Sequence, residues 1–75
     1  MNVALEDAAL RRKLVLFLRR IDEFRTTSFI ARRMHLSHAE LLAQLSEHEA
    51  ASGEKLAVVG ERMDLTPFAR RLLEE

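Results

Sequence analysis

The stretch over residues 26–47 most constrains the fold, because it reads as two short helices joined by a tight turn. Apolar residues at helical spacing give each helix one inner face: Ile30, Ala31 and Met34 in the first, and Leu41, Leu42 and Leu45 in the second. Start signals precede both helices, with Thr26 or Thr27 as the first N-cap and a capping box between Ser37 and Glu40 at the second. The stretch therefore predicts a pair of helices on which the rest of the chain packs.

This pair of helices resembles the helix-turn-helix of the winged-helix family. In that family a small residue inside the first helix lets the two helices cross closely, and Ala31 stands at this position. The family then has an apolar residue, often a glycine, an apolar residue and a polar cap, where this chain has Met34, His35, Leu36 and Ser37. His35 replaces the usual glycine, and histidine is among the residues enriched at positive φ.

A long amphipathic helix is predicted ahead of this pair, from an N-cap at Asn2 to about Phe24. Its buried stripe consists of apolar residues three or four positions apart: Leu10, Leu14, Phe17, Leu18, Ile21 and Phe24. Leu5, Ala9 and Leu16 project more than a quarter-turn away from that stripe. We therefore expect a homodimer through this second apolar strip, although single exposed leucines also occur on monomeric proteins.

Two short β-prone runs follow the helix pair and predict a hairpin over residues 55–66, the position of the wing in the family. Gly53 is the expected stop of the preceding helix, which we predict over residues 37–52. A Gly-containing pair at residues 60–61 separates the two runs. Residues 25–27 are β-tolerant and stand where winged helices often have a brief first strand.

A last helix is predicted from Thr66, a good N-cap, with Pro67 at the first helical position. Residues 65–75 are similar to the junction between the last strand and the last helix of many bacterial winged-helix regulators. The order helix, helix, helix, hairpin, helix covers nearly all 75 residues. We therefore predict one mainly α domain over residues 1–75, a winged helix-turn-helix with a small β-hairpin, and keep a four-helix bundle without the hairpin as the alternative.

Several classes of protein find no support in the sequence. There is no cysteine, which excludes a disulfide framework and a thiolate zinc site and is consistent with a cytoplasmic location. The longest apolar run, residues 14–18, is too short to span a membrane. Only His35 and His38 lie close enough to share a metal, and they lack further ligands at helical spacing. With no phosphate loop and no nucleophile arrangement, we expect a non-enzyme without cofactor or metal.

The resemblance implies binding of duplex DNA, because in DNA-binding relatives the second helix of the pair enters the major groove. Arg32 and Arg33 flank the turn, and Lys55 and Arg62 belong to the expected wing. The side chains expected to contact DNA are Thr27, Arg32, Arg33, Ser37, His38, Gln44, Lys55 and Arg62. The same cations could also simply solubilise exposed helical faces.

The charge pattern opposes ordinary docking of helix 37–52 in a major groove. No Lys or Arg occurs over residues 36–54, whereas Glu40, Glu47, Glu49 and Glu54 are acidic, and the whole chain has zero net charge. Neutralisation of phosphates supplies much of the affinity for DNA. The sequence therefore leaves two functions open: a DNA-binding regulator or architectural factor, and a protein-interaction module or assembly subunit whose acidic face binds a basic protein.

Overall fold

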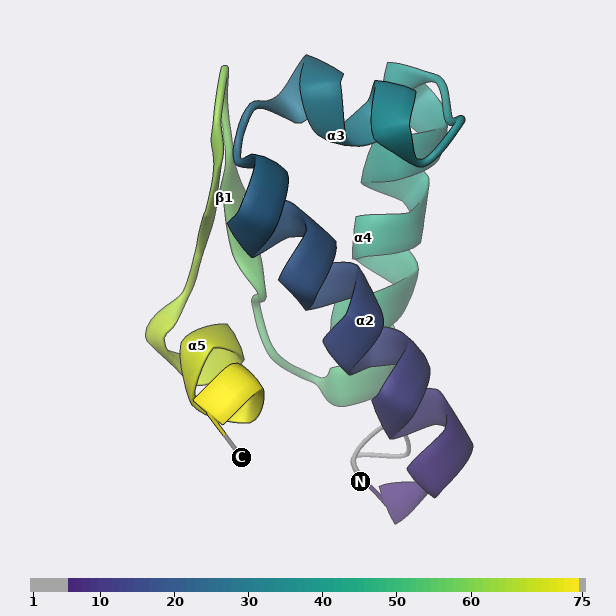
Figure 1. The fold of residues 1–75 in the computed structure, drawn as a ribbon. Helices are drawn as coiled ribbons and strands as arrows, with labels where there is room; N and C mark the ends of the chain where they lie inside the picture. The colour runs from purple at the N-terminus through teal and green to yellow at the C-terminus, as the bar shows by residue number, and fades with distance from the viewer. Residues whose placement is uncertain (1–5, 75) are drawn as a thin grey trace.

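The computed structural model describes residues 6–74 and contains four helices and two strands in that range. In chain order they are α2 (Ala8–Phe24), α3 (Thr27–Arg33), α4 (His38–Ser52), β1 (Ala57–Val59), β2 (Met63–Leu65) and α5 (Pro67–Glu74). The hairpin lies along one side of α2 and α4 along the other, while α3 crosses one end and α5 packs near the opposite end (Figure 1). The mainly helical class with a small hairpin is thus confirmed, and the hairpin-free four-helix bundle is wrong.

The helix α2 begins later than the sequence indicated. Asp7 is its N-cap, and the carboxylate accepts hydrogen bonds from the backbone N–H groups of Ala9 and Leu10. These two hydrogen bonds satisfy two of the backbone donors that the first turn of a helix leaves without a partner. The predicted cap Asn2 and the predicted dimer-interface residue Leu5 lie outside the described residues.

The core forms where the buried stripe of α2 meets the other elements. Leu14, Phe17, Leu18 and Ile21 are buried as predicted. The remaining core side chains come from the helix pair, the hairpin region and α5: Ile30, Ala31, Leu41, Leu45, Leu56, Ala57, Met63, Leu65, Ala69 and Leu72. Leu10 is an exception, because its side chain is 38% exposed at the rim of a groove between α2 and α4. Its assignment to the buried stripe was wrong.

The turn between α3 and α4 has the hydrogen bonds of a Schellman motif. The N–H of Leu36 donates to the carbonyl of Ala31 at 2.8 Å, and the N–H of His35 donates to that of Arg32 at 3.1 Å. His35 occupies the left-handed position with φ of 58°, as the comparison with glycine predicted. The capping box of Ser37 and Glu40 then starts α4.

Packing of the helix pair agrees with the predicted inner faces, with one qualification. Ile30, Ala31, Leu41 and Leu45 are buried, whereas Met34 and Leu42 are only half-buried. The helix α4 ends at Ser52, and Gly53 follows it with φ of 71°, the conformation expected of a glycine stop. No helix in the described part of the chain combines the length and the apolar character needed to cross a membrane.

The hairpin pairs its strands antiparallel, with Ala57 opposite Leu65 and Val59 opposite Met63. Its base is held to α4, because the N–H of Leu56 donates to Oε2 of Glu49 at 2.8 Å. At its other end, Thr26 and Arg62 form an isolated antiparallel bridge. The β-tolerant link at residues 25–27 therefore contributes a single bridge on the free side of β2.

Candidate nucleic-acid interface

The tip of the hairpin is fastened to the start of α3 by hydrogen bonds with two residues, Arg25 and Thr27. The N–H of Met63 donates to the carbonyl of Arg25 at 2.8 Å, and the N–H of Thr27 donates to that of Glu61 at 2.9 Å. The hydroxyl of Thr27 also donates to the carbonyl of Gly60 at 2.7 Å. These bonds hold the hairpin tip beside the helix pair.

An open cleft of about 760 Å³ lies where the hairpin tip meets the first residues of α3 and α4. Its lining residues are Thr26, Thr27, Ser28, His38, Gly60, Glu61 and Arg62. Arg62, His38 and the hydroxyls of Thr26 and Ser28 are exposed there. Guanidinium, imidazole and hydroxyl groups are hydrogen-bond donors, so the cleft is suited to an anionic group; the carboxylate of Glu61 opposes them.

Two predicted contact residues, His38 and Arg62, are brought together in this cleft from elements distant in the sequence. Within residues 6–74, no ion pair engages Arg62. Thr27 also lines the cleft, but its side chain is 2% exposed and its hydroxyl is used by Gly60. The hydroxyl of Thr27 is therefore engaged in positioning the hairpin and is not free for the predicted contact with DNA.

Ser37 lies beside the cleft and acts first as the N-cap of α4. Its hydroxyl accepts a bond from the N–H of Glu40 at 3.1 Å, and its own N–H donates to the Glu40 carboxylate at 2.8 Å. The bonds from the backbone and the side chain of Ser37 lower the pKa of Glu40. The capping box thus favours the charged form of Glu40 one turn into α4.

Two other predicted contact residues do not join the cleft. Lys55 precedes the base of the hairpin, and the register of the strands separates it from Arg62 by roughly 15 Å at the usual rise per residue. Gln44 is half-buried and lines the groove between α2 and α4. The predicted DNA contacts are therefore not gathered in one cleft: Lys55 lies toward the base of the hairpin, and the half-buried Gln44 faces the groove beside α2.

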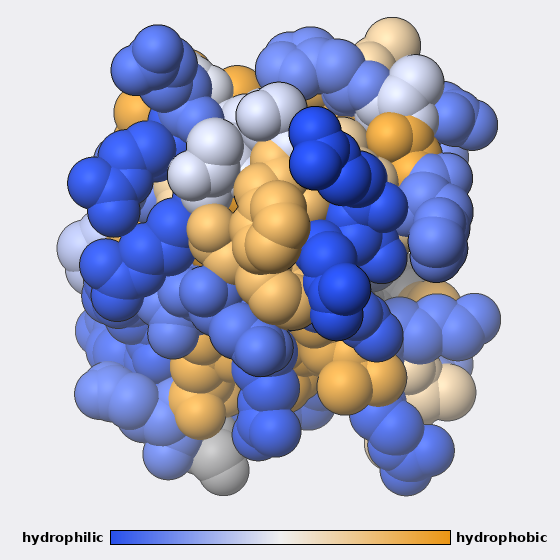
Figure 2. Space-filling view, turned by 45° about the horizontal axis from the view of Figure 1, so that its top comes forward, coloured by the Kyte–Doolittle hydropathy of each residue, from blue (hydrophilic) through white to orange (hydrophobic). Residues whose placement is uncertain are grey.

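Arg32 and Arg33 end α3, and both are exposed. The guanidinium of Arg33 lies over the ring of Phe24, with 5.3 Å between its central carbon and the ring centroid. The ring of Phe24 in turn meets that of Phe29 edge to face, with centroids 5.2 Å apart. Phe29 is 42% exposed. Figure 2 shows this end of the molecule, with apolar side chains gathered between strongly hydrophilic ones.

Ser28 and Phe29 are exposed residues of α3 that were not singled out from the sequence. The signal was present, because Phe29 lies beside the Ile30, Ala31 and Met34 stripe but belongs to a different side of the helix. Its exposure followed only from the packing of α3 on α2, which covers Phe24 in part and leaves Phe29 outside.

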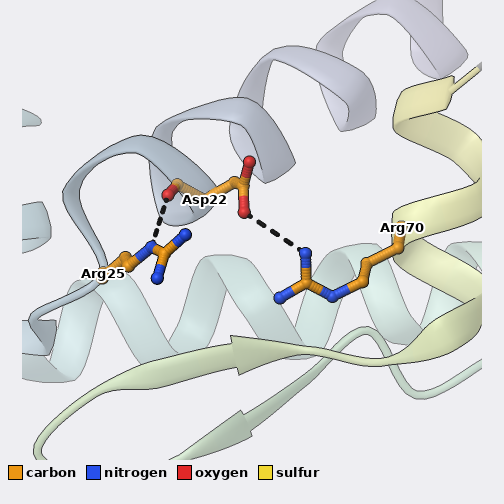
Figure 3. A network of polar contacts seen from close by, with 3 residues as sticks. All are labelled: Asp22, Arg25 and Arg70. Carbon is orange, nitrogen blue, oxygen red and sulfur yellow. Dashed lines mark hydrogen bonds and ion pairs between the residues drawn. The ribbon is translucent and has the colours of Figure 1, made fainter.

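Two further arginines are engaged by the last turn of α2. The Nε of Arg25 donates to the carbonyl of Asp22 at 3.3 Å, and Nη1 of Arg70 lies 3.6 Å from the carboxylate of Asp22 (Figure 3). Neither arginine lines the cleft. Among the residues that line the cleft, Arg62 carries the one guanidinium group, and the two arginines at the end of α3 lie outside the lining.

Comparison of the chain with protein-family models, with curated proteins and with solved structures finds no match. Among residues 6–74, no three His, Cys, Asp or Glu side chains are grouped so that they could hold a metal ion. A function for this chain is therefore inferred from the geometry of the cleft and from the distribution of charge.

Proposed function

We propose that this chain is a winged-helix protein that binds duplex DNA through the cleft between α3, α4 and the hairpin. The order of the elements supports this assignment, with a bridged link between the first two helices, a helix pair and a hairpin after it. The hairpin then corresponds to the wing, and α4 to the second helix of the helix-turn-helix. The tip of the hairpin and the start of α4 lie close together, because residues of both line the cleft.

The observation that carries the proposal is the meeting of Arg62 and His38 in one exposed cleft. The planar guanidinium of Arg62 can donate two parallel hydrogen bonds to a phosphate. Ser28 adds a hydroxyl from α3. Neutral hydroxyls and charged guanidinium groups are the groups that DNA-binding proteins use on the sugar-phosphate backbone.

The acidic side of α4 limits which residues can contribute to the affinity for DNA. Glu40 and Glu47 are exposed, so an approach of α4 to the phosphates is opposed by like charge. The affinity for DNA then depends on three cations: Arg62, Arg32 and Arg33. Three phosphate contacts correspond to a slope of log K against log salt of about −3, which is shallow for a DNA-binding protein. We therefore expect weak, backbone-dominated binding of a regulatory or architectural kind.

The test compares binding of a random-sequence duplex by the wild type, Arg62→Ala and Arg71→Ala, at low and moderate salt. Arg71 is a matched control because it is an exposed arginine on α5, near the opposite end of the molecule. We expect Arg62→Ala to weaken binding about fivefold to tenfold and to lower the salt slope by about one, and Arg71→Ala to leave both unchanged. Equal losses in the two variants, or no wild-type binding at low salt, would overturn the proposal.

A protein partner is the second candidate, and the exposed side of α4 favours it. This side presents small and acidic residues without a single cation: Ala39, Glu40, Ala43, Ser46 and Glu47. Small side chains permit close approach of a basic helix. The substitution Ala43→Arg separates the candidates: it should raise DNA affinity and the salt slope if α4 faces DNA, and should have no such effect if the chain does not bind DNA.

A further inference from the structure

A second hollow of about 520 Å³ runs between α2 and α4, away from the cleft. Its apolar lining includes Leu10, Leu16, Phe17, Met34 and Ala51. Two of these side chains are large and strongly exposed, Leu16 by 52% and Leu10 by 38%. A 75-residue chain has few apolar side chains to bury, so leaving two leucines of one helix in solvent indicates a contact surface.

The two walls of this groove carry opposite charge. The α2 wall contributes Lys13 and Arg20, and the α4 wall contributes Glu47 with the neutral Gln44. None of these charged side chains takes part in an ion pair within the described residues. The groove is therefore apolar along its length, basic on one side and acidic on the other.

We propose that this groove binds a second copy of the same chain, related by a two-fold axis parallel to the groove. Such an axis places the α2 wall of each copy against the α4 wall of the other. Lys13 and Arg20 then face the partner's Glu47, and Leu16 of each copy enters the apolar floor of the other. An axis across the groove would instead oppose like walls, which like-charge repulsion disfavours. The surface is self-complementary, as a two-fold interface requires.

This interface differs from the strip expected from the sequence. Leu16 belongs to both, but Ala9 does not line the groove, and Leu10 and the α4 wall take its place. Leu5 lies outside the described residues and is not part of the argument. The proposal does not depend on DNA binding, because the groove shares no residue with the cleft.

The first test measures self-association of the full chain by sedimentation equilibrium over a range of concentrations, for the wild type, Leu16→Glu and Val58→Glu. Val58 is a matched control, because it is an apolar side chain exposed by 57% on the hairpin. We expect the wild type to form a dimer. The Kd of the dimer should rise about tenfold for Leu16→Glu and should not change for Val58→Glu. Circular dichroism establishes that each variant is folded.

The second test exchanges the charges of the walls. Glu47→Lys should weaken the dimer by about fivefold, because it sets a third cation against Lys13 and Arg20 in each half of the interface, and the addition of Lys13→Glu should restore it. A substitution that merely damaged one chain would not be rescued in this way. A wild type that stays monomeric, a dimer that persists in Leu16→Glu, or a double variant without recovery would each overturn the proposal.

Discussion

The hydroxyl of Thr27 donates a hydrogen bond of 2.7 Å to the carbonyl of Gly60, which lies 33 residues further along the chain. The bond joins the first residue of α3 to the turn of the hairpin and is almost completely removed from solvent at Thr27. It fixes the position of Arg62, two residues beyond Gly60, relative to His38 at the start of α4. The shape of the cleft therefore depends on Thr27, although the hydroxyl of Thr27 is not free to contact a ligand.

Replacement of Thr27 by Val keeps the size of the side chain and removes this bond. The carbonyl of Gly60 then loses this donor in a partly buried setting, so we expect the free energy of unfolding to fall by about 1 kcal/mol. DNA affinity should fall as well, because Arg62 is less firmly positioned. Urea denaturation and duplex binding measure the two effects. Thr27→Ser retains the hydroxyl and should preserve more of both; a Ser variant as impaired as Val would contradict this account.

The carboxylate of Glu49 accepts a hydrogen bond of 2.8 Å from the N–H of Leu56, where the chain enters the hairpin. Leu56 is fully buried, so this N–H has little access to water once the acceptor is removed. We expect Glu49→Ala to lower the free energy of unfolding by about 1–2 kcal/mol and Glu49→Gln, which retains a carbonyl acceptor, by less. Thermal denaturation of the two variants, side by side, provides the measurement, and equal losses would exclude this hydrogen bond as the cause.

The two glycines should respond differently to replacement by alanine. Gly53 has φ of 71°, which strains any residue with a Cβ, whereas a Cβ on Gly60 would meet only the carbonyl oxygen of Arg62, at 3.8 Å. We expect Gly53→Ala to cost about 1 kcal/mol of stability and Gly60→Ala to cost much less. Chemical denaturation distinguishes them. A larger loss at Gly60 would show that the hairpin turn, and not the end of α4, requires glycine.

We expect His48 to make the stability of the fold depend on pH. Its ring packs at a tilt against that of Phe17, with centroids 4.8 Å apart, and burial lowers its pKa although Glu47 acts in the opposite direction. Lys13 and Arg20 of α2 line the same groove. Because the unfolded chain binds this proton more readily, the contribution of neutral His48 is present above the ordinary pKa of about 6.5 and is lost as the pH falls through the lowered value.

The corresponding measurement is the free energy of unfolding of the wild type and His48→Gln as a function of pH, at one fixed protein concentration. We expect stability of the wild type to decrease on acidification below about pH 6.5, and the variant to show a smaller decrease. Parallel curves for the two proteins would assign the pH dependence to other groups.

Local patterns predicted most of the fold. The capping box of Ser37 and Glu40, the glycine stop at Gly53 and the positive φ of His35 all follow from rules that involve residues within a few positions of one another. The start of α2 was misjudged because a cap pattern alone does not show that Asp7 begins a helix of its own. Leu10 was misjudged because helical periodicity shows which face is apolar but not how far along the helix a neighbour covers it.

The candidate site was predicted only in part, because local patterns do not show which residues the packing of neighbouring elements brings together. Arg62, His38, Lys55 and Gln44 are all plausible contacts when judged by residue type and by the element that carries them. Only two of them share the cleft, because the length of the hairpin places Lys55 at its far end and the rotation of α4 turns Gln44 toward α2. Thr27 is polar in the sequence and buried in the fold, where Gly60 supplies its partner.

Within residues 6–74, the sequence by itself determined the type and order of the elements, since helix caps, apolar periodicity and turn residues act over short distances along the chain. Only the tertiary structure decided which side chains meet. The bridge between Thr26 and Arg62 and the bond between Thr27 and Gly60 join segments far apart in the sequence, and no local pattern encodes such a pairing. It arises because burying the apolar faces of α2, the helix pair and the hairpin together leaves one arrangement in which the hairpin tip lies beside α3.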